Sequence, residues 1–123
     1  RTNLLIDKPC VLVDINIPFG EQYLMNEWHY GSERLEVALR NFFGYKACGA
    51  NVIVAVTSQN TARLLIAQNI NSDEKCSNAI TTLSKDIKDY INETLENIEH
   101  YLGLKLEVVK IESLPNLVCV LQK

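Results

Sequence analysis

The stretch that decides the fold reads Asn51-Val-Ile-Val-Ala-Val-Thr-Ser-Gln-Asn-Thr-Ala-Arg-Leu-Leu-Ile-Ala-Gln-Asn69. It contains two apolar runs, Val52–Val56 and Leu64–Ala67, which the polar group Thr57–Thr61 separates. This arrangement predicts a β-hairpin, because apolar runs rich in β-branched residues on either side of a short polar segment are typical of two strands and a turn. Since the runs are apolar at consecutive positions, we expect both faces of the hairpin to be covered, as at the centre of a sheet.

A strand and a helix are predicted before the hairpin. Apolar residues alternate at positions 11, 13, 15 and 17, which indicates a strand from Cys10 that Pro18 ends. Ser32–Phe43 is predicted as an amphipathic helix, because its apolar residues recur three and four positions apart. Ser32 is the expected N-cap and Gly44 the expected C-cap of this helix.

Two helices and two strands are predicted after the hairpin. Capping and acidic side chains in Asn71–Glu74 mark a helix start, and an apolar stripe continues to Leu102. The weaker helix formers in Thr81–Ser84 predict a break between two helices. Leu104–Ile111 is predicted as a strand whose shifted apolar phase indicates a bulge, and Leu117–Leu121 as a last short strand.

This order of elements predicts an α+β fold in a single domain over residues 1–123. With right-handed crossovers it fits a ferredoxin-like split βαβ sandwich, in which an antiparallel sheet has helices on one face and an extra C-terminal strand. A fold of this kind hosts many functions, so the function has to be argued from its sites.

The composition narrows the class of protein. The formal net charge is −3, which argues against a free-standing nucleic-acid binder, although a protein held on RNA by its partners remains compatible with it. The apolar runs are much shorter than the roughly 18 residues of a membrane span, so we expect a soluble protein without membrane contact. The chain begins at Arg1, which is expected of a processed or trimmed product.

The sequence contains no recognisable catalytic set. The acidic pairs at positions 86 and 89 and at 93 and 96 have helical spacing and are typical of a solvated helix face. Glycines 44 and 49 flank a lysine without the spacing of a phosphate-binding loop. We therefore expect no catalytic residues in this chain and no cofactor.

The cysteines and histidines are isolated from one another in the sequence. Cys10, Cys48, Cys76 and Cys119 form no Cys-x-x-Cys pair, whereas zinc sites usually show close pairs. Reduced structural thiols are the favoured interpretation, and disulfides or a metal site are the alternative.

The segment Phe19–Tyr30 is rich in aromatic residues and has no clean period. It is expected to be a loop whose rings cover the edge of the core. The alternative is a contact surface for a partner or for stacked bases, with flat faces supplied by Trp28, His29 and Tyr30. A third interpretation is a small-molecule enzyme with a pocket near His29.

Two sets of candidate contact residues follow from the predicted sheet. The candidate RNA contacts are the basic side chains beside it: Lys8, Arg40, Lys46 and Arg63. The candidate partner contacts are the aromatic residues and the apolar hairpin positions: Trp28, Tyr30, Val52, Val54, Leu64 and Ile66.

Several segments together resemble the small ferredoxin-like protein subunits of ribonuclease P and ribonuclease MRP. The similarity lies in a helix with a Phe-Gly end, an apolar hairpin, a short helix and two final apolar segments. These are Leu35–Gly44, Ala47–Ala50, Val52–Val56, Ala62–Ala67, Ser72–Lys75, Ile80–Leu83, Leu106–Ser113 and Leu117–Leu121.

The resemblance implies a non-catalytic subunit of a ribonucleoprotein that processes precursor tRNA or rRNA. In that family the RNA carries out the cleavage, and the protein pairs with a related small subunit and other proteins in the nucleus or nucleolus. The competing hypothesis is a protein-only heterodimeric scaffold or assembly chaperone, which is expected in the cytoplasm.

Overall fold

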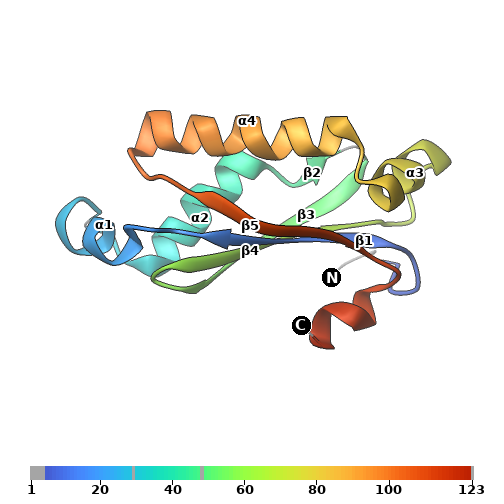
Figure 1. The fold of residues 1–123 in the computed structure, drawn as a ribbon, viewed down its shortest axis with the longest axis horizontal. Helices are drawn as coiled ribbons and strands as arrows, with labels where there is room; N and C mark the ends of the chain where they lie inside the picture. The colour runs from blue at the N-terminus through green and yellow to red at the C-terminus, as the bar shows by residue number, and fades with distance from the viewer. Residues whose placement is uncertain (1–4, 29, 48, 123) are drawn as a thin grey trace.

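The computed structural model describes residues 5–28, 30–47 and 49–122, apart from the side chains of Ser32 and Lys46. Within these residues, five strands form one antiparallel sheet in the order β2-β3-β4-β1-β5 (Figure 1). The strands are β1 (Cys10–Asn16), β2 (Lys46–Ala47), β3 (Ala50–Ser58), β4 (Thr61–Ala67) and β5 (Glu107–Leu114). The helices are α1 (Gly20–Asn26), α2 (Ser32–Phe43), α3 (Glu74–Thr82), α4 (Lys85–Leu102) and the 3₁₀ helix η1 (Leu117–Gln122).

The four longer strands confirm the predicted fold class. β4 lies between β1 and β3 and runs antiparallel to both, which makes the split βαβ arrangement, and β5 pairs antiparallel with the other side of β1. Helices α2, α3 and α4 lie on one face of the sheet (Figure 1). None of the described helices is both long enough and apolar enough to cross a membrane.

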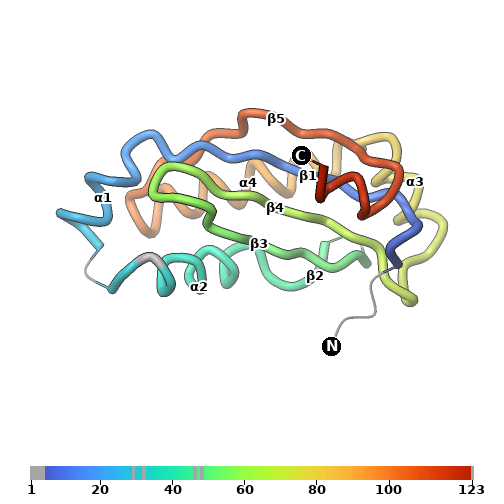
Figure 2. Tube along the Cα trace, turned by 90° about the horizontal axis from the view of Figure 1, so that it is seen from below, coloured from blue at the N-terminus to red at the C-terminus, as the bar shows by residue number. Residues whose placement is uncertain are grey.

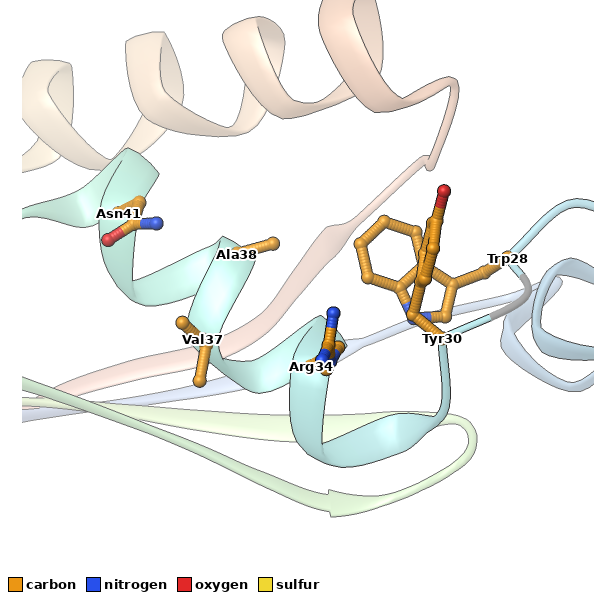
Figure 3. Close-up of a pocket in the computed structure, with 6 residues that line it drawn as sticks. All are labelled: Trp28, Tyr30, Arg34, Val37, Ala38 and Asn41. Atoms are coloured by element: carbon orange, nitrogen blue, oxygen red, sulfur yellow. The ribbon is translucent and has the colours of Figure 1, made fainter.

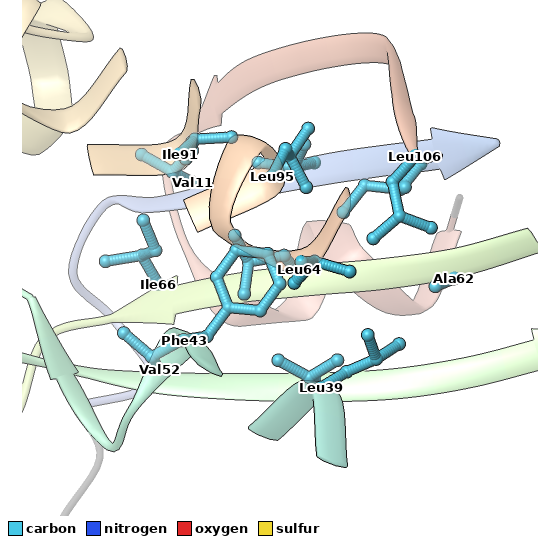
Figure 4. Close-up of a cluster of buried hydrophobic side chains, with 14 of the residues drawn as sticks. Val11, Leu39, Phe43, Val52, Ala62, Leu64, Ile66, Ile91, Leu95 and Leu106 are labelled. Atoms are coloured by element: carbon cyan, nitrogen blue, oxygen red, sulfur yellow. The ribbon is translucent and has the colours of Figure 1, made fainter. Parts of the chain in front are cut away.

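The main core lies between the sheet and these helices, where alternate strand residues meet the apolar stripes of α2 and α4 (Figure 4). Because strand side chains alternate between faces, every second residue of β1, β3 and β4 points into this core. Its strand members include Val11, Val13, Ile15, Val52, Val54, Ala62, Leu64 and Ile66, all at most 7% exposed.

The predicted break between the last two helices is confirmed. Leu83 follows α3 in the left-handed conformation, with φ of 51°, and the hydroxyl of Ser84 accepts a hydrogen bond from the amide of Ile87 at 3.4 Å. Ser84 therefore caps a new helix. The expected bulge is also present, since the register between β1 and β5 shifts beside Val109.

Two predicted elements differ in the structure. The expected strand over Leu117–Leu121 is wrong, because the segment forms η1. Asn116 caps this turn by accepting a hydrogen bond from the amide of Cys119 at 3.1 Å, and the turn packs Leu117, Cys119 and Val120 against the sheet. The expected loop Phe19–Tyr30 contains α1, which packs through Tyr23 against the end of α4, where its hydroxyl donates to the carbonyl of Leu102 at 3.0 Å.

Candidate functional site

The side of the sheet that faces away from α2, α3 and α4 is here called the outward sheet face. At one end η1 covers it, and a small second core forms there (Figures 1 and 2). The sheet residues of this second core are Cys10, Leu12, Leu65, Ala67 and Leu114, and those of η1 are Leu117, Cys119 and Val120. No other described helix covers the remaining part of the outward sheet face (Figures 1 and 2).

The open part is organised in cross-strand rows, which the strand register defines. One row is apolar at its β3 end: Ile53 lies opposite Leu65, which lies opposite Leu12, and Leu12 lies opposite Glu112. Ile53 is 38% exposed. Directly opposite neighbours in a sheet contact one another, so this row continues the second core towards the edge of the sheet.

The next row carries charges of alternating sign. Arg63 lies opposite Asp14, and Asp14 lies opposite Lys110 on its other side. The Arg63 Nε and Asp14 Oδ1 atoms are 3.0 Å apart, and each side chain is about one-third exposed, at 35% and 34%. Lys110 also lies 3.5 Å from Glu112. Arg63, Lys110, Asp14 and Glu112 together carry two positive and two negative charges, so this part of the face is balanced in charge rather than basic.

A shallow hollow of about 290 Å³ lies over this charged row. Its lining combines the Arg63–Asp14 pair with the hydroxyls of Thr57 and Thr61 and the side chain of Val109, which is 68% exposed. An apolar residue beside a compensated ion pair is a combination typical of protein interfaces, which mix apolar area with satisfied polar groups.

The hairpin residues predicted as partner contacts lie elsewhere, and this corrects the sequence prediction. Val52, Val54, Leu64 and Ile66 are 7%, 1%, 0% and 0% exposed and pack beneath the helices. The alternation of strand side chains decides this, because a residue that faces the helices cannot also face a partner. Among the hairpin residues, Ile53 has the opposite phase, lies on the outward sheet face and is 38% exposed.

The four predicted basic contacts are not brought together. Lys8 is exposed in the segment before β1, and Arg63 is engaged with Asp14. Lys46 lies in β2, and its side chain is outside the described part of the chain. Arg40 belongs to a different arrangement at the edge of the sheet.

Arg40 and Glu36 of α2 close the edge of β3. Arg40 Nε donates to the carbonyl of Val54 at 3.3 Å, and Glu36 accepts a hydrogen bond from the amide of Val56 at 2.8 Å. The two side chains also form an ion pair at 2.7 Å. Because backbone groups at a sheet edge need partners, Arg40 has a structural role here.

A second surface, here called the aromatic groove, runs along α2 beside the connection from α1 (Figure 3). It has a volume of about 430 Å³ and is lined by Trp28, Tyr30, Arg34, Val37, Ala38 and Asn41. Tyr30 and Val37 are 63% and 51% exposed. The groove is largely apolar, with one cation and one amide on its rim.

Some aromatic residues of the segment Phe19–Tyr30 cover the core, and others are exposed as a contact surface would be. Tyr23 is buried and stacks with Trp28 at 6.1 Å between ring centroids, so these rings cover the core as expected. Burial, followed by the nearby carboxylate of Glu27, raises the pKa of Tyr23. Tyr30 contacts Trp28 edge to face at 5.2 Å and is open to a partner. His29 lies outside the described residues.

The described thiols are placed in cores. Cys10 and Cys119 are free thiols in the second core, and Cys76 is buried in the main core. Burial, followed by the neighbouring Cys119, raises the pKa of Cys10 to about 11. Its thiol is therefore protonated at neutral pH and is a poor nucleophile. Cys48 lies outside the described residues.

No cluster of three or more His, Cys, Asp or Glu side chains that could hold a metal ion is found within residues 5–28, 30–47 and 49–122. The site and fold together define an α+β protein of the ferredoxin-like class with one partly open sheet face. Neither the models of known protein families nor the curated proteins contain a match to this sequence.

Proposed function

We propose that this chain is a non-catalytic protein subunit of an RNA-processing ribonucleoprotein, similar to the small subunits of ribonuclease P and ribonuclease MRP. In such a complex the RNA cleaves precursor tRNA or rRNA, and this chain joins a related small subunit and other proteins on it. The nucleus or nucleolus is the expected location of the complex.

The observation that carries the proposal is which residues the outward sheet face exposes. RNA-binding sheets of this general type expose aromatic rings on which bases stack. The open part of this sheet instead presents Ile53, Val109 and the charge-balanced pair Arg63–Asp14. These residues favour a protein neighbour over a phosphate backbone, in keeping with the formal net charge of −3.

The proposed role is therefore assembly. A partner subunit covers the outward sheet face and brings this chain onto the RNA, where exposed cations such as Lys8 make peripheral contacts. The exposed residues of η1, Val118 at 52% and Leu121 at 87%, extend the apolar part of the same surface. Burial of such side chains contributes roughly 25 cal/mol per Å² of apolar area to assembly.

The test is affinity purification of the tagged chain at its native expression level, with and without nuclease treatment. The proposal expects one structured RNA and several small protein subunits to be recovered, and nuclease to release at least part of the set. Recovery of the same proteins with no RNA in either sample would contradict it.

A matched pair of variants identifies the surface. Ile53→Asp places a charge on the outward sheet face and is expected to reduce recovery of both proteins and RNA. Val37→Asp is the control, because Val37 is comparably exposed but lies in the aromatic groove. Equal losses from the two variants would contradict a specific role of the outward sheet face in assembly.

The second candidate function is a protein-only heterodimeric scaffold or assembly chaperone. The aromatic groove favours it, because a largely apolar groove beside an exposed tyrosine suits an apolar segment of a client protein. In this case Val37→Asp should abolish partner recovery, and nuclease should have no effect.

A further inference from the structure

The two edges of the sheet differ in how they are closed. On the β3 side, β2 pairs with the first part of β3, and the side chains of Glu36 and Arg40 bond to the backbone further along. These partners leave little of that edge open to another strand. An edge closed in this way is one of the devices by which proteins prevent edge-to-edge association.

The opposite edge is formed by β5, Glu107–Leu114, along one side of the sheet (Figure 2). Within the described residues β5 pairs with one strand, β1, so every second amide and carbonyl of β5 points towards the side where no strand lies. On this strand Val108, beside α4, and Val109, beside the charged row, are 36% and 68% exposed. A long edge strand with β-branched residues is a template for strand addition.

We propose that β5 pairs antiparallel with β5 of a second copy of this chain, about a two-fold axis beside Ile111. The pairing would join two sheets into one. It uses the edge of the sheet, and the only described residues of the outward sheet face that it engages are Lys110 and Glu112, so it does not depend on the proposed function.

The charges on β5 indicate that the added strand is β5 of a second copy, and they also set the register between the two strands. Lys110 and Glu112 share a face of the strand, with Nζ and Oε1 3.5 Å apart. With the axis at Ile111, Lys110 of each copy lies opposite Glu112 of the other, so four charges alternate in sign. Moving the axis by one residue would place Lys110 opposite Lys110, or Glu112 opposite Glu112. Like charges directly opposite one another are destabilising, so the centred register is favoured.

The irregularity of β5 fits the same register. Because the two copies run antiparallel about Ile111, the bulge at Val109 of each copy lies opposite Ser113 of the other, and Pro115 follows the end of β5. Bulges and prolines oppose strand addition where they occur, and the regular segment between them is Lys110–Leu114. About this axis Lys110–Glu112 of one copy lie opposite the same residues of the other, so the axis falls at the centre of a short regular ladder.

The test is sedimentation equilibrium of the purified 123-residue chain over a wide range of protein concentration. The wild-type chain is expected to form a concentration-dependent dimer. Lys110→Glu introduces like charges at both symmetric contacts and should raise the dimer dissociation constant by about tenfold or more. The double variant with Glu112→Lys restores opposite charges and should return the constant to within about threefold of wild type.

Lys105→Glu is the matched control, because it makes the same charge change at an exposed residue outside β5 and should leave the dimer intact. Circular dichroism and urea unfolding of each monomer separate weakened pairing from weakened folding. Hydrogen exchange at low and high concentration should show added protection confined to the amides of β5. A monomer at every concentration, a dimer indifferent to Lys110→Glu, or added protection away from β5 would each overturn the proposal.

Discussion

Arg63 of β4 lies directly opposite Asp14 of β1, with Nε and Oδ1 3.0 Å apart on the outward sheet face. The pair joins the two central strands and neutralises the cation that the sequence offers as an RNA contact. Because both side chains are partly exposed, water screens their attraction.

We expect the coupling between these two residues to be small. In a double-mutant cycle of Arg63→Ala and Asp14→Ala, the interaction free energy should be less than about 1 kcal/mol. Urea unfolding of the four proteins measures it. The exposed pair Lys85–Asp89 on α4, whose charged atoms are 3.9 Å apart, provides a reference cycle that should give a still smaller value. A coupling of several kcal/mol would show that the pair holds the sheet together.

Two neighbouring hairpin residues should lose very different amounts of stability on the same substitution. Val54→Asp places a carboxylate in the main core, where Val54 is 1% exposed, and should unfold the domain or cost at least about 3 kcal/mol. Ile53→Asp faces the outward sheet face and should cost less than about 1.5 kcal/mol. Circular dichroism and urea unfolding measure both losses of stability. A larger loss for Ile53→Asp than for Val54→Asp would mean that Ile53, and not Val54, faces the main core.

Gly20 is expected to tolerate no side chain. A Cβ atom at this position would lie 1.8 Å from the backbone carbonyl oxygen of Gln59, at the tip of the β3–β4 hairpin. Gly20→Ala must therefore displace α1 or the hairpin, and we expect a loss of about 2–3 kcal/mol in the free energy of unfolding.

The neighbouring exposed residue provides the control for Gly20. Gln22→Ala lies in the same helix and should change the free energy of unfolding by less than about 0.5 kcal/mol. Equal unfolding midpoints for the two variants would mean that α1 does not pack against the hairpin tip.

Tyr90 should contribute to a loss of stability at high pH. Burial raises its pKa from 10.0 to about 12, and its hydroxyl donates to the carbonyl of Phe43. Since the folded pKa is above the unfolded value, the contribution is fully present below pH 10 and is lost as the pH rises to about 12.

The measurement is urea unfolding as a function of pH for wild type and Tyr90→Phe. At neutral pH the variant should be less stable by about 1 kcal/mol, because one hydrogen bond is lost. Above pH 10 its stability should fall less steeply than that of the wild type. Cys10, whose pKa is about 11, adds a decline of the same sign in both proteins and therefore cancels in the comparison. Parallel pH profiles would contradict the assignment to Tyr90.

Helices α2, α3 and α4, and the break between the last two, could be predicted from the sequence, because the apolar spacing and the residues at the helix ends agree there. The structure places α2 over Ser32–Phe43 as predicted, because the apolar spacing and Gly44 define the helix independently of its surroundings, although its N-cap is Gly31 and not the expected Ser32. The weak helix formers before Ser84 located the break between α3 and α4 for the same reason. The order of these elements was enough to predict a ferredoxin-like sheet.

The surfaces could not be predicted in the same way. In a run that is apolar at every position, the sequence cannot say whether Val52 or Ile53 faces the helices, because both side chains are equally suited to burial. The sequence also could not show that Asp14 would meet Arg63, 49 residues away. That contact depends on the register between β1 and β4.

The hairpin at Asn51–Asn69 therefore had its existence and its apolar character determined by sequence alone, whereas the expectation that both of its faces are covered was wrong, because Ile53 is 38% exposed on the outward sheet face. Only the tertiary structure decided which of its faces is core and which is open. The helices cover one face, and η1 covers part of the other. The physical reason is that local preferences act within a few residues, whereas burial depends on which distant segments pack together.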